Sequence, residues 1–122
     1  MSRGLLIDTD VLVDYLSGRD QAADFLEYAR DDLHLSVVTL AELGPFVRNE
    51  AEWLALDAAL AAFAIHPVDA VIARAAGGLK SKTFTHRLLA ATAAVHDLRL
   101  VTRDKKSYPD TPQVLVPYQK II

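Results

Sequence analysis

Three acidic residues stand at positions where their carboxylates could share one site. Asp8 directly follows the apolar run of residues 4–7. Glu42 lies one helical turn past a second apolar run, and Asp104 lies just past a later one. Carboxylate oxygens suit hard cations such as Mg²⁺ and Mn²⁺, whereas clustered carboxylates without a cation repel one another. A bound metal ion lowers the pKa of water and stabilises charge that develops on a phosphate, so the pattern favours phosphodiester chemistry.

Each of these acids also has a purely structural explanation. Asp8 is suited to cap the helix that follows it, because an Asp side chain accepts from the free N–H groups of a first turn. The segment Thr39–Glu42 matches the Thr-x-x-Glu capping box. Asp104 is placed to cap a short turn over Lys105 and Lys106. Taken one position at a time, both explanations stay open.

The residues between these acids indicate strands alternating with helices. Unbroken apolar runs are typical of strands buried on both faces, and apolar spacings of three and four are typical of helices. The predicted strands cover residues 4–7, 33–38, 65–66, 98–102 and 114–116, and the predicted helices cover 11–16, 21–30, a segment from about 40, 50–63, 69–76 and 88–96. This order predicts an α/β fold with a parallel, three-layer sheet of about five strands and 114–116 at its edge. Sites in such folds lie at the carboxyl ends of the strands, where the three acids fall.

Composition limits the class of protein. A chain of 122 residues fits a single domain over residues 1–122, and its hydrophobic fraction of 52% excludes a disordered tail. The absence of cysteine excludes a disulfide scaffold and a thiolate zinc site. Neither a signal peptide nor an apolar run of membrane-spanning length is found, so we expect a soluble, cytoplasmic protein. The net charge of −3 argues against a non-specific nucleic-acid coat but not against a nuclease.

The remaining charged residues are less specific. Asp10 and Asp14 are expected mostly on the solvated face of the first helix, although Asp10 is the better candidate to touch the site. Two basic groups are candidates for the rim of an acidic pocket, where they would hold nucleic-acid phosphates, or are ordinary solvated charges. They are Lys80, Lys82 and Arg87, and Arg103, Lys105 and Lys106.

Four short motifs occur in a fixed order along almost the whole chain: Leu6–Leu12, Ser36–Leu43, Leu88–Ala93 and Leu100–Asp104. Together they resemble the PIN-domain family, and within it the VapC-like toxins of toxin–antitoxin pairs. The resemblance implies a parallel sheet between helices and a Mg²⁺- or Mn²⁺-dependent endoribonuclease that hydrolyses RNA. It also implies a homodimer, silenced by a small antitoxin protein that covers or enters the acidic cleft.

The same resemblance assigns roles residue by residue. Asp8, Glu42 and Asp104 fall on the acidic, metal-binding and catalytic positions of the family. Thr102 falls on the hydroxyl position beside them. Asp10 falls where the family usually has Asn or Asp.

Position 86 departs from the family. An Asp normally opens the helix that continues as Leu88–Ala93, and here the corresponding residue is His86, followed by Arg87. His86 is either a substitute metal ligand, or an exposed loop residue left after the site decayed, or irrelevant because another acid, such as Asp69, replaces it. The second reading leads to an alternative function, a catalytically weakened PIN protein retained to bind an antitoxin, RNA or its own second copy. The other histidines, His34, His66 and His96, lack metal-ligand spacing and are expected to be structural.

Overall fold

The computed structural model describes residues 4–30 and 32–119, in which five strands form one parallel sheet. The strands are β1 (Leu5–Ile7), β2 (Leu33–Ser36), β3 (Ala64–His66), β4 (Arg99–Val101) and β5 (Val114–Leu115). Their order across the sheet is β3-β2-β1-β4-β5, and every neighbouring pair runs parallel. The predicted parallel α/β fold is therefore confirmed, including an edge position for β5.

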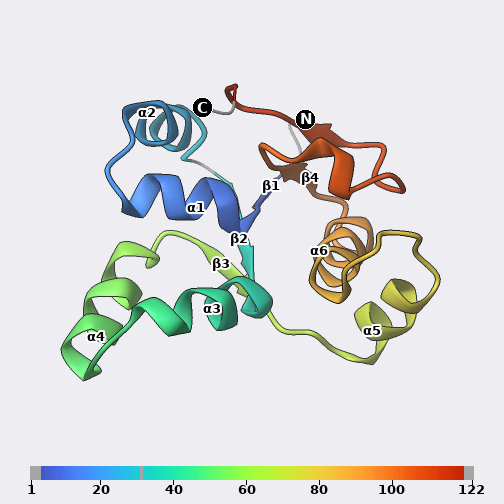
Figure 1. The fold of residues 1–122 in the computed structure, drawn as a ribbon, viewed down its shortest axis with the longest axis horizontal. Coiled ribbons are helices and arrows are strands. Elements are labelled where there is room, and N and C mark those ends of the chain that lie inside the picture. Colours follow the sequence, from blue (N-terminus) through green and yellow to red (C-terminus); the bar gives the residue numbers. More distant parts are fainter. Residues whose placement is uncertain (1–3, 31, 120–122) are drawn as a thin grey trace.

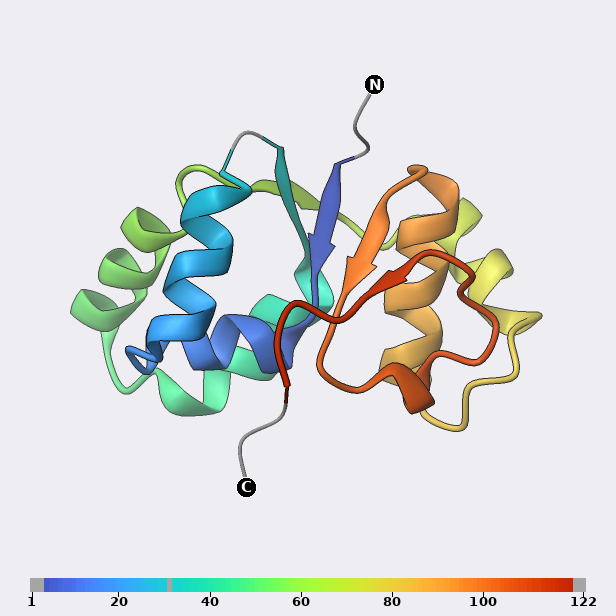
Figure 2. The same cartoon turned by 90° about the horizontal axis from the view of Figure 1, so that it is seen from above.

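Helices cover both faces of this sheet (Figure 1). They are α1 (Thr9–Leu16), α2 (Asp20–Tyr28), α3 (Val37–Leu43), α4 (Glu50–Ala59), α5 (Ala70–Gly77) and α6 (Phe84–Val95), with short 3₁₀ turns η1 (Gly44–Phe46) and η2 (Lys105–Ser107). Figure 2 shows α1 to α4 on one side of the sheet and α5 and α6 on the other. The arrows of β1 and β4 end near the start of α1 and near η2, so these segments share the carboxyl edge of the sheet.

The two faces of the sheet support separate hydrophobic cores. Ile7 packs in a core with the apolar faces of α1 to α4, whereas its neighbour Leu6 packs in a second core with α6. Both side chains are fully buried. Successive strand residues point to opposite faces, which explains why β1 is apolar without alternation. Leu56 of α4 and Leu60, which caps the end of that helix, are buried in the first core.

The second strand is shorter than predicted, and this changes the structural role of Thr39. The strand ends at Ser36 instead of continuing to Val38, because the Ser36 hydroxyl accepts from Val38 N at 3.0 Å and caps α3. Helix α3 therefore begins at Val37 and not near Leu40. Thr39 lies inside the helix, so the capping box predicted for Thr39–Glu42 is wrong.

Other helix boundaries also moved from their predicted places. Helix α4 ends at Ala59, four residues before the predicted end. Helix α6 begins at Phe84 instead of Leu88, because the Thr83 hydroxyl accepts from His86 N at 3.2 Å and caps an earlier first turn. Throughout residues 4–30 and 32–119, the helices fall short of the length and apolarity that a membrane crossing requires.

Candidate metal centre

Asp8 is buried at the junction between β1 and α1, with 5% of its surface exposed. Its Oδ1 accepts from Thr9 N at 2.7 Å, so the predicted N-cap role is confirmed. Its Oδ2 accepts from two hydroxyls, those of Thr102 and Tyr108, each at 2.8 Å. Capping one helix needs only one oxygen, and the second oxygen faces groups from the other end of the chain.

Thr102 links three acids at the end of β4. Its fully buried hydroxyl lies 2.8 Å from Asp8 Oδ2 and 3.3 Å from Asp10 Oδ2, and it accepts from Asp104 N at 3.0 Å. Asp10 Oδ2 also accepts from Arg103 N at 3.0 Å. Asp10 therefore points towards Thr102 and Asp8 and does not lie on a solvated face, which was the main expectation for it.

Glu42 reaches the same edge from α3. Its Oε1 accepts from the Thr9 hydroxyl at 2.5 Å, and the Thr9 and Thr39 hydroxyls lie 3.0 Å apart. Since the Thr9 proton is directed at Glu42, the buried Thr39 hydroxyl is the donor to Thr9. Glu42 itself is exposed, so its carboxylate is anchored at one oxygen and accessible at the other.

Asp104 is the most loosely attached of the acids. Its Oδ2 accepts from the Ser107 hydroxyl at 2.5 Å, and Ser107 N donates to Asp104 O at 3.2 Å. Asp104 stands at the N-cap position of the turn η2, but its side chain accepts from a hydroxyl and not from a backbone amide, so the predicted side-chain cap is not formed. The side chain is exposed and is held only by that surface hydrogen bond, while its backbone is held at Thr102.

The electrostatics of the buried pair favour a cation. Burial raises the pKa of Asp8, although its bonds from Thr102 and Tyr108 oppose this. Burial, and then the charge of Asp8, raise the pKa of Asp10 to about 6. Burial and the Asp8 charge also raise the pKa of Tyr108, so its hydroxyl remains a protonated donor. Two carboxylates with raised pKa values at one edge are a pair that a positive ion would stabilise.

The carboxylate oxygens of these acids are suitable ligands for a hard divalent cation, but the four side chains do not surround one common point. In the described part of the chain, no group of three or more His, Cys, Asp or Glu side chains is arranged so that it could hold a metal ion. Asp8 and Asp10 converge on Thr102, whereas Glu42 turns to Thr9 and Asp104 to Ser107. Both outer acids are exposed, so side-chain rotation alone would change which atoms they face.

His86 lies in the first turn of α6 and is half-buried, so it is not the exposed loop residue that one reading predicted. Its Nδ1 lies 2.5 Å from the Thr83 hydroxyl, and its ring stands edge-on to Tyr108 with centroids 5.0 Å apart. It contacts the Tyr108 that holds Asp8, and its charge also acts on Asp8, lowering the pKa of that carboxyl against the effect of burial. Asp69 is wrong as a replacement acid, because its side chain caps α5 at Ile72 N, 2.9 Å away.

Two of the rim candidates have structural partners instead. Arg87 donates to Ser81 O at 2.9 Å, and Arg103 forms an ion pair with Asp14 at 2.8 Å. Asp14 was predicted on a solvated face, but it is 6% exposed and also accepts from the Tyr118 hydroxyl at 2.8 Å. Arg103 and Tyr118 come from distant parts of the chain, which no local pattern reveals, whereas a third partner, Arg19 at 3.3 Å, lies close by in the sequence. The candidates Lys80, Lys82, Lys105 and Lys106 remain exposed.

The other histidines contact one another. His34 Nδ1 lies 2.8 Å from His66 Nε2, and His34 Nε2 lies 2.6 Å from Asp32 Oδ1. The rings of His66 and His96 stack with centroids 4.2 Å apart. These contacts agree with the structural role that was expected of them.

Sequence reasoning missed the roles of Thr9 and Tyr108, which each orient an acid, and of Thr39, which orients Thr9. Thr9 and Thr39 sit among the predicted motifs, where a hydroxyl next to an Asp or three residues before a Glu was a usable signal. Tyr108 lies in a loop about 100 residues from Asp8, and no periodic pattern marks it.

Comparison with known proteins agrees with this geometry. Residues 5–112 match the family described as the PIN domain. Ribonuclease VapC10 of Mycobacterium tuberculosis is 38% identical over 93% of this chain and 92% of that protein, and Ribonuclease VapC19 of the same organism is 35% identical over 93% and 98%. A toxin–antitoxin complex from Klebsiella pneumoniae has a TM-score of 0.84 at 28% identity, over 96% of this chain and 100% of that one. The chain therefore belongs to the PIN-domain family, and within it to the VapC-like branch.

Proposed function

We propose that this protein is a metal-dependent endoribonuclease, the toxin of a VapC-like toxin–antitoxin pair, acting in the cytoplasm as one PIN domain. The observation that carries the proposal is the arrangement of Asp8, Asp10, Glu42 and Asp104 at one edge of the sheet. Thr9 joins Glu42 to Asp8, through its hydroxyl and its N–H respectively, and the Thr102 hydroxyl joins Asp8 and Asp10 to the backbone of Asp104. Relatives that share this fold over more than nine-tenths of the chain are named ribonucleases, which supports the same chemistry here.

Asp8, Glu42 and Asp104 would hold one Mg²⁺ or Mn²⁺ ion, with Asp10 and Thr102 supporting the cluster. Such an ion supplies charge stabilisation at the phosphate and lowers the pKa of water. The protein contributes the orientation: Thr102 and Tyr108 fix Asp8, and Thr9 fixes Glu42. These bonds limit the freedom of the carboxylates before any ion arrives, which reduces the entropy lost on binding it.

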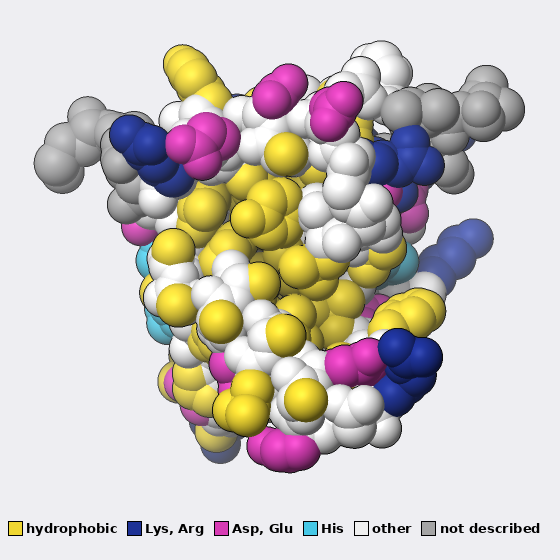
Figure 3. Space-filling model, turned by 90° about the vertical axis from the view of Figure 1, so that its left-hand side faces the viewer, with side chains coloured by type: hydrophobic (Ala, Val, Ile, Leu, Met, Phe, Trp, Pro, Cys, Tyr) yellow, Lys and Arg dark blue, Asp and Glu magenta, His cyan; other side chains and the backbone are white. Residues whose placement is uncertain are grey.

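A small antitoxin protein is the proposed partner, and the structure offers an apolar groove for it. The groove has a volume of about 460 Å³ and lies between the end of α1, η1 and α4. Figure 3 shows hydrophobic side chains gathered on the side of the molecule that carries α2 and α4. Phe46 and Leu16, which line the groove, are 73% and 41% exposed. Large exposed apolar patches mark protein interfaces, and the solved structure from Klebsiella pneumoniae is described as a toxin–antitoxin complex.

A homodimer is also proposed. Val71 on α5 and Phe84 on α6 are 61% and 66% exposed, on the opposite side of the sheet from the groove. An exposed apolar surface there would remain after an antitoxin had covered the groove. Light scattering at high micromolar concentration should give twice the chain mass, and a monomer mass would contradict this part of the proposal.

The activity is tested by incubating the purified protein with total bacterial RNA in Mg²⁺, in Mn²⁺ and in chelator. We expect discrete cleavage products with one or both ions and intact RNA in the chelator. Intact RNA under all three conditions, from a folded protein, would favour the catalytically weakened alternative.

A further inference from the structure

A basic hollow of about 340 Å³ lies next to the acidic cluster. Its lining includes Lys80, Lys82, His86 and Lys106, together with Ser81 and Ser107. Tyr108 connects the two sites, because its hydroxyl donates to Asp8 while its ring stands against His86. The hollow is thus one side chain away from the carboxylates.

The segments that carry the lysines are fastened to each other. The Ser81 hydroxyl donates to Ser107 O at 2.6 Å, which joins the loop before α6 to the turn η2. Arg87 donates to Ser81 O at 2.9 Å, and Lys80 N donates to Asp110 Oδ2. Figure 2 shows η2 beside the start of α6. Although the lysine side chains are exposed, the backbone that presents them is therefore held in place.

The chemistry of the lining favours an anion. None of the described residues that line the hollow is acidic. The hollow also lies at the start of α6, a helix of 12 residues, where the helix dipole adds positive potential. The Thr83 hydroxyl accepts from His86 N and has its own proton available to Nδ1. With that bond made, a neutral His86 carries its ring proton on Nε2 and remains a donor.

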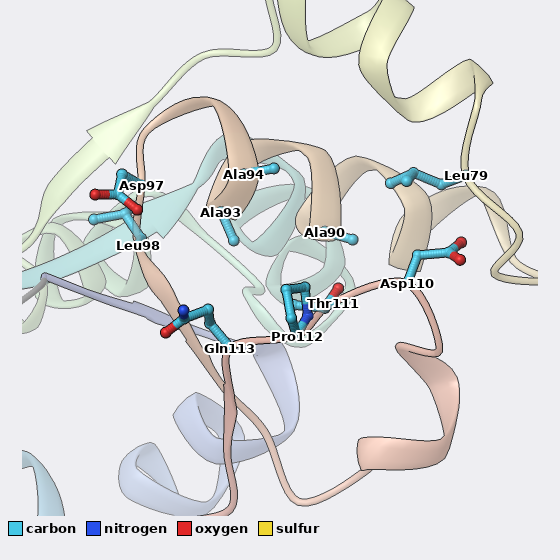
Figure 4. A pocket seen from close by; sticks show the side chains of 10 residues that line it. All are labelled: Leu79, Ala90, Ala93, Ala94, Asp97, Leu98, Asp110, Thr111, Pro112 and Gln113. Atoms are coloured by element: carbon cyan, nitrogen blue, oxygen red, sulfur yellow. The ribbon is translucent and has the colours of Figure 1, made fainter.

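A second hollow shows that this basic lining is not general. Figure 4 shows a pocket of about 250 Å³ between α6 and residues 110–113, lined mainly by small and apolar side chains such as Ala90, Ala93 and Leu98. Within the described chain it has no Lys, Arg or His in its lining, and it includes Asp97 and Asp110. The lysines are concentrated at the hollow that adjoins the acidic cluster.

We propose that the basic hollow binds a phosphodiester group of the RNA strand, next to the phosphate that is cleaved at the acidic cluster. This inference rests on the proposed nuclease function and names the part of the substrate that the hollow recognises. An RNA strand carries a negative charge at every nucleotide, so a site built only of carboxylates would repel the phosphates on either side of the metal. Lys80, Lys82 and Lys106 offset that repulsion on one side, and the strand is positioned by the lysines and cut at the acids.

The test is RNA binding measured without cleavage. Fluorescence anisotropy with a labelled, single-stranded RNA decamer in chelator gives the affinity at several salt concentrations. We expect the double variant Lys82→Gln/Lys106→Gln to bind roughly tenfold more weakly at low salt, with a salt-dependence slope smaller by about 0.7 for each phosphate that the variant no longer neutralises. Arg30→Gln/Arg74→Gln removes the same charge from exposed positions outside the hollow and should leave affinity and slope unchanged. Unchanged thermal unfolding confirms that each variant is folded.

The outcomes separate the hollow from the nuclease function. Equal affinity and slope for the wild type and the Lys82/Lys106 variant would overturn the proposal, even if the wild type cleaves RNA. Weaker binding by that variant supports it, even if no RNA is cleaved and the proposed activity fails. Decamers with a 5′-hydroxyl and a 5′-phosphate distinguish the source of the anion. An equal loss for both supports an internal phosphodiester, whereas a loss confined to the 5′-phosphate RNA overturns that assignment.

Discussion

The acidic and basic sides of the carboxyl edge are built in different ways. The acids come from strand ends and first helical turns, and buried hydroxyls and backbone amides hold Asp8 and Asp10. The lysines come from a loop and a 3₁₀ turn, which a serine and an arginine join at backbone carbonyls. The two inner acids, Asp8 and Asp10, thus have fixed side chains, whereas the basic side has a fixed backbone with exposed side chains. This difference suits a metal site, which needs defined geometry, beside a strand-binding site, which needs mainly charge.

The largest effect is expected from removing one fixed acid. Asp8→Asn keeps the shape of the side chain and the hydrogen bond from Thr9 N but removes the negative charge. Loss of a single well-placed catalytic group commonly costs a factor on the order of 100 to 1000 in rate, and we expect a decrease of that size in RNA cleavage. RNA affinity in chelator should not fall, because the lysines are intact. Asp24→Asn, an exposed acid on α2, is the matched control and should cleave like the wild type. Cleavage by Asp8→Asn at close to the wild-type rate would contradict the site assignment.

A smaller effect is expected at the residue between the two sides. Tyr108→Phe removes the hydroxyl that donates to the buried Asp8 carboxylate while keeping the ring against His86. Hydrogen bonds to charged groups contribute about 1.5 to 3 kcal/mol, and Thr102 still donates to the same oxygen, so we expect stability to fall by about 2 kcal/mol. Chemical denaturation of metal-free protein measures it. A variant as stable as the wild type would mean that Tyr108 does not hold Asp8.

Substitutions at position 86 test whether His86 belongs to the acidic cluster or to the basic hollow. If His86 marks a decayed metal site, restoring an acid with His86→Asp would tighten Mg²⁺ binding and raise RNA cleavage. With His86 as a ligand, His86→Ala would abolish Mn²⁺-dependent activity. The structure places His86 in the lining of the basic hollow, so we expect His86→Asp to weaken RNA binding in chelator by about tenfold through like-charge repulsion, without raising RNA cleavage in Mg²⁺. Tighter Mg²⁺ binding and faster cleavage by His86→Asp would contradict this and restore the decay reading.

The features predicted best from the sequence are those marked by a local pattern of residues. The apolar runs of β1 and β4 are visible because both strands are buried on both faces. Asp8 was found because it follows the first run directly, and Asp104 because it lies just past the second. The end of β2 was misplaced because two valines favour a strand, while the Ser36 cap that starts α3 depends on one hydrogen bond. Boundaries set by a single cap are the hardest to see in a chain.

Partners far apart in sequence could not be predicted. Arg87 was placed on a rim because it is basic, although its partner, the loop carbonyl of Ser81, is close by in the sequence. Arg103 was placed there too, and its partner, the buried Asp14, lies far away along the chain. Tyr108 was missed for the same reason, since its bond with Asp8 spans most of the chain. The lysines were found by composition alone, and only the bond between Ser81 and Ser107 shows that two separate basic groups meet in one hollow.

The smallest expected effect is a pH dependence of the stability of metal-free protein, which comes from the acidic side and not from the basic side. Burial and then the Asp8 charge raise the pKa of Asp10 from its ordinary value of 3.8 to about 6. The folded chain therefore holds this proton more tightly than the unfolded chain does. The resulting contribution to stability is complete below about pH 4 and is lost as the pH rises through about 6. We expect metal-free protein to lose about 1 kcal/mol from this cause between about pH 4.5 and 7.5, a modest figure because Asp10 is only partly buried.

Two variants isolate that contribution from other titrating groups. Asp10→Asn cannot titrate, so the difference between its unfolding free energy and that of the wild type should change by about 1 kcal/mol across the same pH range. Lys82→Gln should show the pH dependence of the wild type, because its charge belongs to the basic side and does not change in this range. Adding Mg²⁺ at about pH 7.5 should stabilise the wild type more than Asp10→Asn, since the ion replaces the proton as the partner of the buried acids. A wild-type stability that rises steadily over this pH range in parallel with Asp10→Asn would mean that the acids are already satisfied without a cation. The buried acids would then need no metal ion to offset their charge.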